Sequence, residues 1–327
     1  MATSSGPPRK RSRAGAVAAV VSTPSSDRRL HDCTGLTVAV VGGWRHVLSF
    51  LSSAESYAVS PTCVAFLRAT AALITRASFH HTYGCTRMAP ALIVSRLTSA
   101  LARFPNVQHV DLHNCRLVRR NPGRIPLPAN DPLPQGLYSS RSLATLDLYA
   151  NRLVELDPAI GNLASSLTRL DLEKTSLSAL APQLFHCVKL QWLSVRWNPL
   201  RVLPPAIGAL RCLTTLNIER CLLTVLPVEL FDCVALTTLH CAYNAALTIL
   251  PEEVGQLLAL ERLELGGCAI AVLPAALGEM PKLELLSFRR TSASAPNTNP
   301  CARRGVVNVE HKRIVSALRA NEVNIVW

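Results

Sequence analysis

The chain has 327 residues, of which 49% are hydrophobic and 5% aromatic, and its formal net charge is +13. This hydrophobic fraction is sufficient for a core, which excludes a disordered or fibrous protein and allows one or two domains. Because aromatic residues are few while Leu, Ala and Val are abundant, we expect a core of many similar aliphatic layers.

A cluster of cations lies near the start of the chain, at Arg9, Lys10, Arg11 and Arg13. We predict a disordered basic tail over residues 1–35. Two other interpretations stay open: PPRKRSR is typical of a nuclear-import patch, and AGAVAAVV, with no acid before Asp27, is typical of a targeting peptide. No folded basic face with interleaved aromatic residues is evident, so we expect no nucleic-acid partner.

Residues 36–105 are expected to be helical. WRHVLSFL predicts one short helix, the capping-box pattern Ser52-Ser53-Ala54-Glu55 begins a second, and Ser60-Pro61 begins a third. PALIVSRLTSALARF predicts a further helix at about 90–103. No apolar run approaches the roughly 20 residues that cross a bilayer, so we expect no membrane partner.

A repeat dominates the rest of the sequence. From Leu143 the pattern L-x-x-L-x-L-x-x-N-x-L-x-x-L-P-x-x-L-x-x-L recurs every 23 or 24 residues, with starts at Leu143, Leu167, Leu190, Leu213, Leu236, Leu260 and Leu283. A divergent copy begins at Val107, so residues 106–292 contain about eight units, and an insertion is expected at 118–141. The ninth position holds only small residues able to bind the backbone: Cys115, Asn151, Thr175, Asn198, Cys221, Asn244, Cys268 and Thr291.

This pattern resembles the leucine-rich repeat, in particular the L-P-x-x-I/L-G-x-L type of plant intracellular Ras-group proteins and animal Ras-pathway scaffolds. The expected fold is therefore an α/β leucine-rich-repeat solenoid, with a curved parallel sheet on the concave face, short helices on the convex face and an α-helical N-terminal cap. A C-terminal cap is expected over 293–327, with a helix around 310–320. For function, the resemblance implies protein binding.

The stretch VLSFLSSAESYAVSPTCVAFLRAT resembles an F-box, and Val59 occupies one of the family's apolar positions. The family's Leu-Pro opening is missing, and Val40-Val41-Gly42-Gly43 stands in its place. The resemblance implies docking on a Skp1-type adaptor of a cullin-type ubiquitin ligase through Val47, Leu48, Phe50, Leu51, Cys63 and Phe66. The alternative is a helical cap that covers the first repeat. The solenoid would then be a signalling or structural scaffold without a ligase.

The third, fifth, seventh and eighth positions of each unit should face outward on the strand side. Trp192, Arg196, Trp197 and Tyr243 are the strongest candidates for contact with a partner protein, because Trp, Tyr and Arg dominate interface hot spots. The alternative for Trp197 and Tyr243 is packing on neighbouring units. The complete predicted protein-binding set is Arg169, Glu173, Trp192, Arg196, Trp197, Glu219, Arg220, His240, Tyr243, Arg262 and Glu264.

No catalytic, cofactor or metal site is predicted, and we expect no enzyme. VAVVGGW lacks the glycine spacing and the Lys-Ser/Thr of phosphate loops, and His109 and His113, with Asp111 between them, are interpreted as surface residues. None of the 11 cysteines forms a C-x-x-C pair. We interpret those within the repeats as reduced packing residues of a cytoplasmic or nuclear protein: Cys115, Cys187, Cys212, Cys221, Cys233, Cys241 and Cys268.

Overall fold

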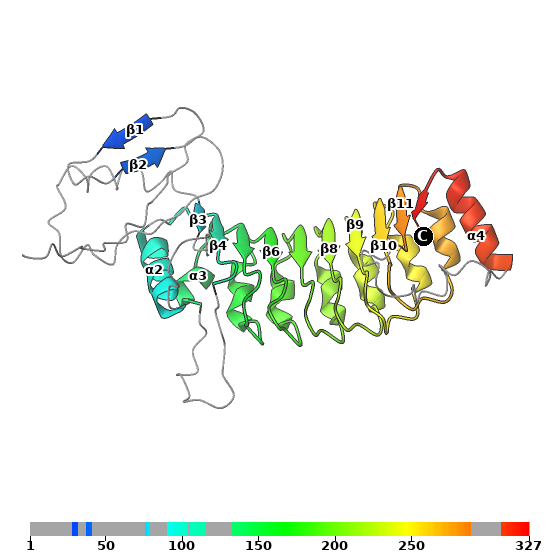
Figure 1. Cartoon of the computed structure of the whole chain (residues 1–327), viewed down its shortest axis with the longest axis horizontal. Helices are drawn as coiled ribbons and strands as arrows, with labels where there is room; N and C mark the ends of the chain where they lie inside the picture. The colour runs from blue at the N-terminus through cyan, green and yellow to red at the C-terminus, as the bar shows by residue number, and fades with distance from the viewer. Residues whose placement is uncertain are drawn as a thin grey trace, which may run out of the picture.

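The computed structural model describes residues 28–31, 37–40, 76–78, 90–103, 105–115, 133–288 and 309–326. In this part of the chain, ten parallel strands form one open, curved sheet in which β3 to β12 follow each other in sequence order (Figure 1). The strands are β3 (Arg76–Ser78), β4 (His109–Asp111), β5 (Thr145–Asp147), β6 (Arg169–Asp171), β7 (Trp192–Ser194), β8 (Thr215–Asn217), β9 (Thr238–His240), β10 (Arg262–Glu264), β11 (Leu285–Ser287) and β12 (Asn324–Val326).

The predicted repeat is confirmed, and neighbouring units are paired in register. Strands β4 to β11 occupy the third to fifth positions of the eight units, and equivalent residues pair across the sheet, as Leu193 does with Leu216. The central residue of each strand is buried and the third-position residue is at least partly exposed, because successive side chains of a strand point to opposite faces. The coils therefore bury their leucines against each other and leave an open strand face.

In the six units that begin at Leu143 to Leu260, the second half forms a 3₁₀ turn on the opposite side of the sheet. Glycine in the L-P-x-x-I/L-G pattern is needed for coil packing, because a Cβ on Gly208 would lie 2.5 Å from the carbonyl oxygen of Glu229. The six turns are η1 (Pro158–Leu163), η2 (Pro182–His186), η3 (Pro205–Ala209), η4 (Val228–Asp232), η5 (Glu252–Gln256) and η6 (Ala275–Glu279).

Ninth-position side chains hold adjacent coils together, as predicted. The Nδ2 of Asn198 donates to the carbonyls of Val195 in its own coil and Leu172 in the preceding coil, at 2.8 and 2.7 Å. Its Oδ1 accepts from the backbone N–H groups of Thr175 and Leu177. Cysteine makes a smaller contribution, since Cys221 Sγ donates only weak bonds, of 3.3 Å to the carbonyl of Val195 and 3.8 Å to that of Glu219. These buried contacts satisfy backbone groups that the turning chain would leave unpaired.

Longer helices occur in both end coils. The predicted helices are present as α2 (Pro90–Arg103), between β3 and β4, and α4 (Val309–Ala320), which contacts η6. Leu97 of α2 and Leu318 of α4 are buried in the shared core. None of the helices in the described ranges is long and apolar enough to cross a membrane.

Of the expected insertion, 118–141, the structure describes residues 133–141, at its C-terminal end. Residues there form α3 (Gln135–Tyr138), which contacts α2 and η1. Leu137 and Tyr138 are buried and supply the convex packing of the first unit, a contribution that the proline-rich composition concealed.

Near the N-terminus, β1 (Arg28–His31) and β2 (Thr37–Val40) pair antiparallel, so a short strand occurs inside the range expected to be a disordered tail. The predicted adaptor-docking residues lie outside the described residues: Val47, Leu48, Phe50, Leu51, Cys63 and Phe66.

The expectation for Cys212 was wrong. Six of the seven repeat cysteines are buried, but Cys212 is exposed. Cys187 and Cys233 lie at the twenty-first position of their units and point into the core, whereas Cys212 lies two positions later in its unit, just before the next inward leucine. Burial raises the pKa of the Cys221 and Cys233 thiols to about 12, so they are poor nucleophiles.

Candidate functional site

The strand face of the central coils carries a network of ion pairs. Arg196 on β7's coil binds Glu219 of the next coil through two atoms, with Nε to Oε2 at 2.9 Å and Nη2 to Oε1 at 3.0 Å. Its Nη1 lies 3.4 Å from Oε1 of Glu173 in the preceding coil. The arginine side chain remains 31% exposed, against 15% for Glu173 and 12% for Glu219. The carboxylates therefore lie deeper than the cation, and the accessible charge is positive.

Trp192 forms a second feature of this face. The guanidinium carbon of Arg169 lies 3.4 Å from the centre of its ring, which is a cation–π contact between adjacent strands. The indole is half-buried beneath this cation. Arginine stacked on a tryptophan presents a flat, rigid surface of the kind found at interface hot spots.

The eighth position has a left-handed backbone in every described unit. The φ angles are positive at Asn114, Ala150, Lys174, Trp197, Arg220, Tyr243 and Gly267. This region costs an L-residue roughly 1–2 kcal/mol, and only glycine visits it freely. Of the seven residues, Gly267 alone is a glycine, so the remaining units place larger side chains where the fold would favour glycine.

These eighth-position side chains alternate between cations and aromatic rings. The Arg220 guanidinium lies between Trp197 and Tyr243, at 4.4 and 3.9 Å from the ring centres. Lys174 lies 5.6 Å from the Trp197 ring and donates to the Tyr149 hydroxyl at 2.8 Å. Packing on neighbouring units, the alternative expected for Trp197 and Tyr243, therefore occurs, while Trp197 is still 43% exposed. We call Lys174, Trp197, Arg220 and Tyr243 the edge ladder.

At the N-terminal end of the face, the fifth position of three consecutive units is an aspartate. Asp111, Asp147 and Asp171 lie on consecutive strands, and each accepts a hydrogen bond from the backbone N–H two residues later. Burial, reinforced by the neighbouring carboxylates Asp147 and Glu173, raises the pKa of Asp171 to about 6. Burial also raises the pKa of Asp147.

Of the two histidines weighed as metal ligands, His113 and not His109 lies within a group of potential ligand atoms in the described part of the chain. His113 pairs with Asp111, with Nδ1 and Oδ1 at 2.9 Å, and a carboxylate oxygen of Asp147 lies within 4.8 Å of both. Burial lowers the pKa of His109, and Arg76 lowers it further. The internal ion pair and the backbone bonds account for the arrangement of Asp111, His113 and Asp147.

At the C-terminal end, His240 and Glu264 form a pair between adjacent strands, with Nδ1 and Oε2 at 2.9 Å. The hydrogen bond from His240 lowers the pKa of Glu264. Tyr243 packs against Gly267, where an added Cβ would lie 3.1 Å from its ring. Every predicted contact residue thus lies on the strand face or its edge: Arg169, Glu173, Trp192, Arg196, Trp197, Glu219, Arg220, His240, Tyr243, Arg262 and Glu264.

The predicted contact set left out Tyr149, and it also left out Lys174, although Lys174 was expected on the outward face. Both occupy outward positions, the seventh and the eighth, of units that begin at Leu143 and Leu167. Counting those positions from the first complete unit onward would have found them. The left-handed backbone of the eighth position gave no signal, because the residue types there differ among the seven units in which it is described.

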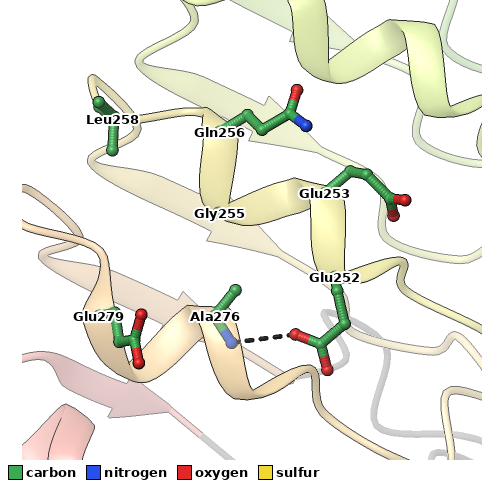
Figure 2. Close-up of a pocket in the computed structure, with 7 residues that line it drawn as sticks. All are labelled: Glu252, Glu253, Gly255, Gln256, Leu258, Ala276 and Glu279. Atoms are coloured by element: carbon green, nitrogen blue, oxygen red, sulfur yellow. Dashed lines mark hydrogen bonds between the residues drawn. The ribbon is translucent and has the colours of Figure 1, made fainter.

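A shallow depression of about 460 Å³ lies between η5 and η6 on the convex side. Figure 2 shows Glu252 reaching across to the backbone of Ala276, the first turn of the next coil. Its carboxylate accepts from the N–H groups of Ala275 and Ala276 at 3.0 and 3.1 Å. Glu252 therefore joins two coils, and both of its carboxylate oxygens already accept hydrogen bonds.

Comparison with known proteins agrees with this architecture. Residues 141–200 match the family model described as leucine rich repeat. A leucine-rich-repeat protein of Leptospira interrogans is similar in structure, with 22% identity and a TM-score of 0.51 over 70% of this chain and 57% of that protein. Internalin C2 of Listeria monocytogenes is similar at 19% identity and a TM-score of 0.51, over 66% of this chain and 81% of that one. The chain thus spans little more than half of the Leptospira protein, and these likenesses establish the fold.

Proposed function

We propose that this leucine-rich-repeat solenoid binds another protein through its strand face, and that it has no catalytic activity of its own. The observation that carries the proposal is the concentration of Trp192, Arg196 and Trp197 on one open coil, with Arg169 and Arg220 stacked against the two rings. Tryptophan and arginine supply most of the binding energy in protein interfaces. Because acids and bases alternate across these coils, the surface suits a protein better than a polyanion.

The backbone at the eighth position supports the same proposal. Lys174, Trp197, Arg220 and Tyr243 keep left-handed conformations that glycine would adopt without strain. Strain of this kind is retained mainly where the side chain has a function. The edge ladder is therefore assigned to contact with the partner.

The binding test compares variants of the face in a pull-down followed by mass spectrometry. Trp192→Ala combined with Trp197→Ala should remove the specific partner, whereas Val188→Ala combined with Val234→Ala, at two exposed positions away from the strand face, should retain it. Retention of every specific partner by the double tryptophan variant would contradict the proposal.

For the biological role, we propose the substrate-recognition subunit of a cullin-type ubiquitin ligase. The support is the F-box resemblance of residues 47–70 and its place ahead of the repeats. The N-terminal segment would dock on a Skp1-type adaptor and the strand face would hold the substrate. The alternative role is a signalling or structural scaffold of the Ras-group kind.

Co-purification distinguishes these roles. A Skp1-type protein should co-purify with the full chain and be lost on Leu48→Asp combined with Leu51→Asp. Binding at the strand face should persist in that variant. Recovery of a small GTPase or a cytoskeletal protein without ligase subunits would instead support the scaffold.

A further inference from the structure

A second surface of the same coils is apolar and lies beside the strand face. The thirteenth position, equivalent to the fourteenth in the unit with an extra alanine, holds Val202, Val225, Ile249 and Val272 in four consecutive coils. These side chains are 57%, 49%, 66% and 66% exposed, and Leu222 nearby is 51% exposed. We call these five residues the aliphatic stripe. A contiguous exposed row of this kind is typical of an interaction site.

The backbone beneath the aliphatic stripe is fixed. The N–H of Leu222 donates to the carbonyl of Leu200 in the preceding coil, and the N–H of Ala269 donates to Leu247, both at 2.9 Å. The buried Leu223 N–H also donates to Asn244 Oδ1. Because these bonds join successive coils, the stripe is preorganised, and a ligand would not have to order it on binding.

The borders of the aliphatic stripe carry opposite charges. From Lys174 to Val272, the eighth to thirteenth positions contain Lys174, Arg201 and Arg220 but no acid. On the convex side, the residues just after the stripe include the exposed Glu252 and Glu253 of η5. A partner must therefore be acidic along the edge that meets Arg201, and neutral or basic along the other edge.

The size and spacing of the stripe select the form of the partner. Five half-exposed aliphatic side chains present a few hundred Å², roughly half of the ~800 Å² that each protein contributes to a standard interface, so a second copy of the chain is a poor occupant. Adjacent coils are about 4.8 Å apart, close to the ~5.4 Å pitch of an α-helix but shorter than the ~6.7 Å between same-face residues of a strand. One helical turn thus meets one coil.

We infer that the aliphatic stripe binds an amphipathic α-helix of about three turns, supplied by another protein, whose leucine-type face covers the stripe and whose acidic edge meets Arg201. The interaction mode is helix-in-groove recognition, with anchors at i, i+3 or i+4, and i+7. This site is separate from the strand face, so the solenoid holds two ligands side by side.

The test selects ligands for the purified full chain from a phage-displayed library of random 16-residue helical peptides. Enriched peptides should combine apolar residues at i, i+3 or i+4, and i+7 with acids on one edge. The enriched peptides are then synthesised and their affinities measured. Val225→Glu combined with Ile249→Glu should lower the affinity at least about tenfold, as expected for central contacts. Arg201→Glu should lower the peptide affinity about threefold or more, whereas Arg201→Lys should leave it unchanged.

The matched control is Val188→Glu combined with Val234→Glu. These valines are 49% and 55% exposed but lie directly after the 3₁₀ turns and ahead of the next strands. Peptide affinity should stay within about twofold of the wild type. Trp192→Ala combined with Trp197→Ala should also retain the peptides, which separates this site from the proposed strand-face function.

Several results would overturn the inference. These are an absence of enrichment, enrichment of basic peptides, or unchanged binding in the Val225→Glu, Ile249→Glu variant while its thermal melt is native. Sedimentation of the wild type gives a further check. A dimer that dissociates in the same variant would assign the aliphatic stripe to a second copy of the chain.

Discussion

The interior of the coils and their strand face follow opposite rules. Inside, the same kinds of residue recur in every unit: buried leucines such as Leu193 and Leu216, and a small hydrogen-bonding side chain such as Asn198. On the face the residues differ from coil to coil, and several oppose the fold, as the left-handed Trp197 and the half-buried carboxylate of Asp171 do. The interior therefore stabilises the fold, whereas some side chains of the face lower that stability and are not needed for folding.

The largest expected effect is on the interior. Leu216 is fully buried at the centre of β8, so Leu216→Ala should lower the free energy of unfolding by about 2–5 kcal/mol, through lost burial and the cavity left behind. A urea melt of the variant measures this loss. An unchanged melt would remove Leu216 from the core and weaken the contrast between the two regions.

The ninth-position row should show a graded effect. Asn198→Ala removes bonds to three carbonyls, two backbone N–H groups and the Thr175 hydroxyl, which should cost about 3 kcal/mol because buried backbone groups lose their partners. Cys221→Ala removes two weak sulfur bonds and should cost about 1 kcal/mol. Thermal melts of the two variants provide the comparison. Equal losses would mean that packing, and not hydrogen bonding, fixes this row.

Features governed by the interior could be predicted from the sequence. The recurring leucines located β4 to β11, and the Asn, Thr and Cys residues of the ninth position identified the bonds between coils. Strand β3 was not predicted, because its sequence, Arg-Ala-Ser, lacks the leucine pattern. The exposure of Cys212 was missed because its position in the unit, and not its residue type, determines burial.

Features of the face were predicted as positions but not as interactions. Alternation in the strands showed that Glu173, Arg196 and Glu219 face outward, and parallel register places them side by side. Their ion pairs follow from that register and could have been derived. The stacking of Arg220 between Trp197 and Tyr243 could not, since it depends on a left-handed backbone that no residue type signals.

A substitution whose effect on stability depends on pH should show that a residue of the strand face destabilises the protein. The pKa of Asp171 is raised to about 6, so the folded state binds its proton more tightly than the unfolded chain, and stability falls as the pH rises from about 4 through 6. Asp171→Asn should therefore stabilise the protein by about 1–3 kcal/mol at pH 8 and by much less at pH 4, with solvent screening favouring the lower value.

Asn217 is the natural precedent for this substitution, because it occupies the same position and accepts the Glu219 N–H at 3.0 Å. Urea melts of wild type and Asp171→Asn at the two pH values measure the difference. A variant that is less stable than the wild type at pH 8 would contradict the raised pKa.

The smallest expected effect isolates backbone strain on the face. Trp197→Ala and Trp197→Gly lose the same ring contacts with Arg220, but alanine keeps the strain at φ 57° and glycine does not. The glycine variant should be more stable than the alanine variant by about 1 kcal/mol, as relief of the left-handed conformation exceeds the entropy that glycine adds to the unfolded chain. Gly267 already occupies the equivalent position with φ 77°. Paired thermal melts test the order, and both variants should bind the strand-face partner equally weakly. If alanine is the more stable residue, the eighth position carries no strain, and its tryptophan, arginine and tyrosine need no functional explanation.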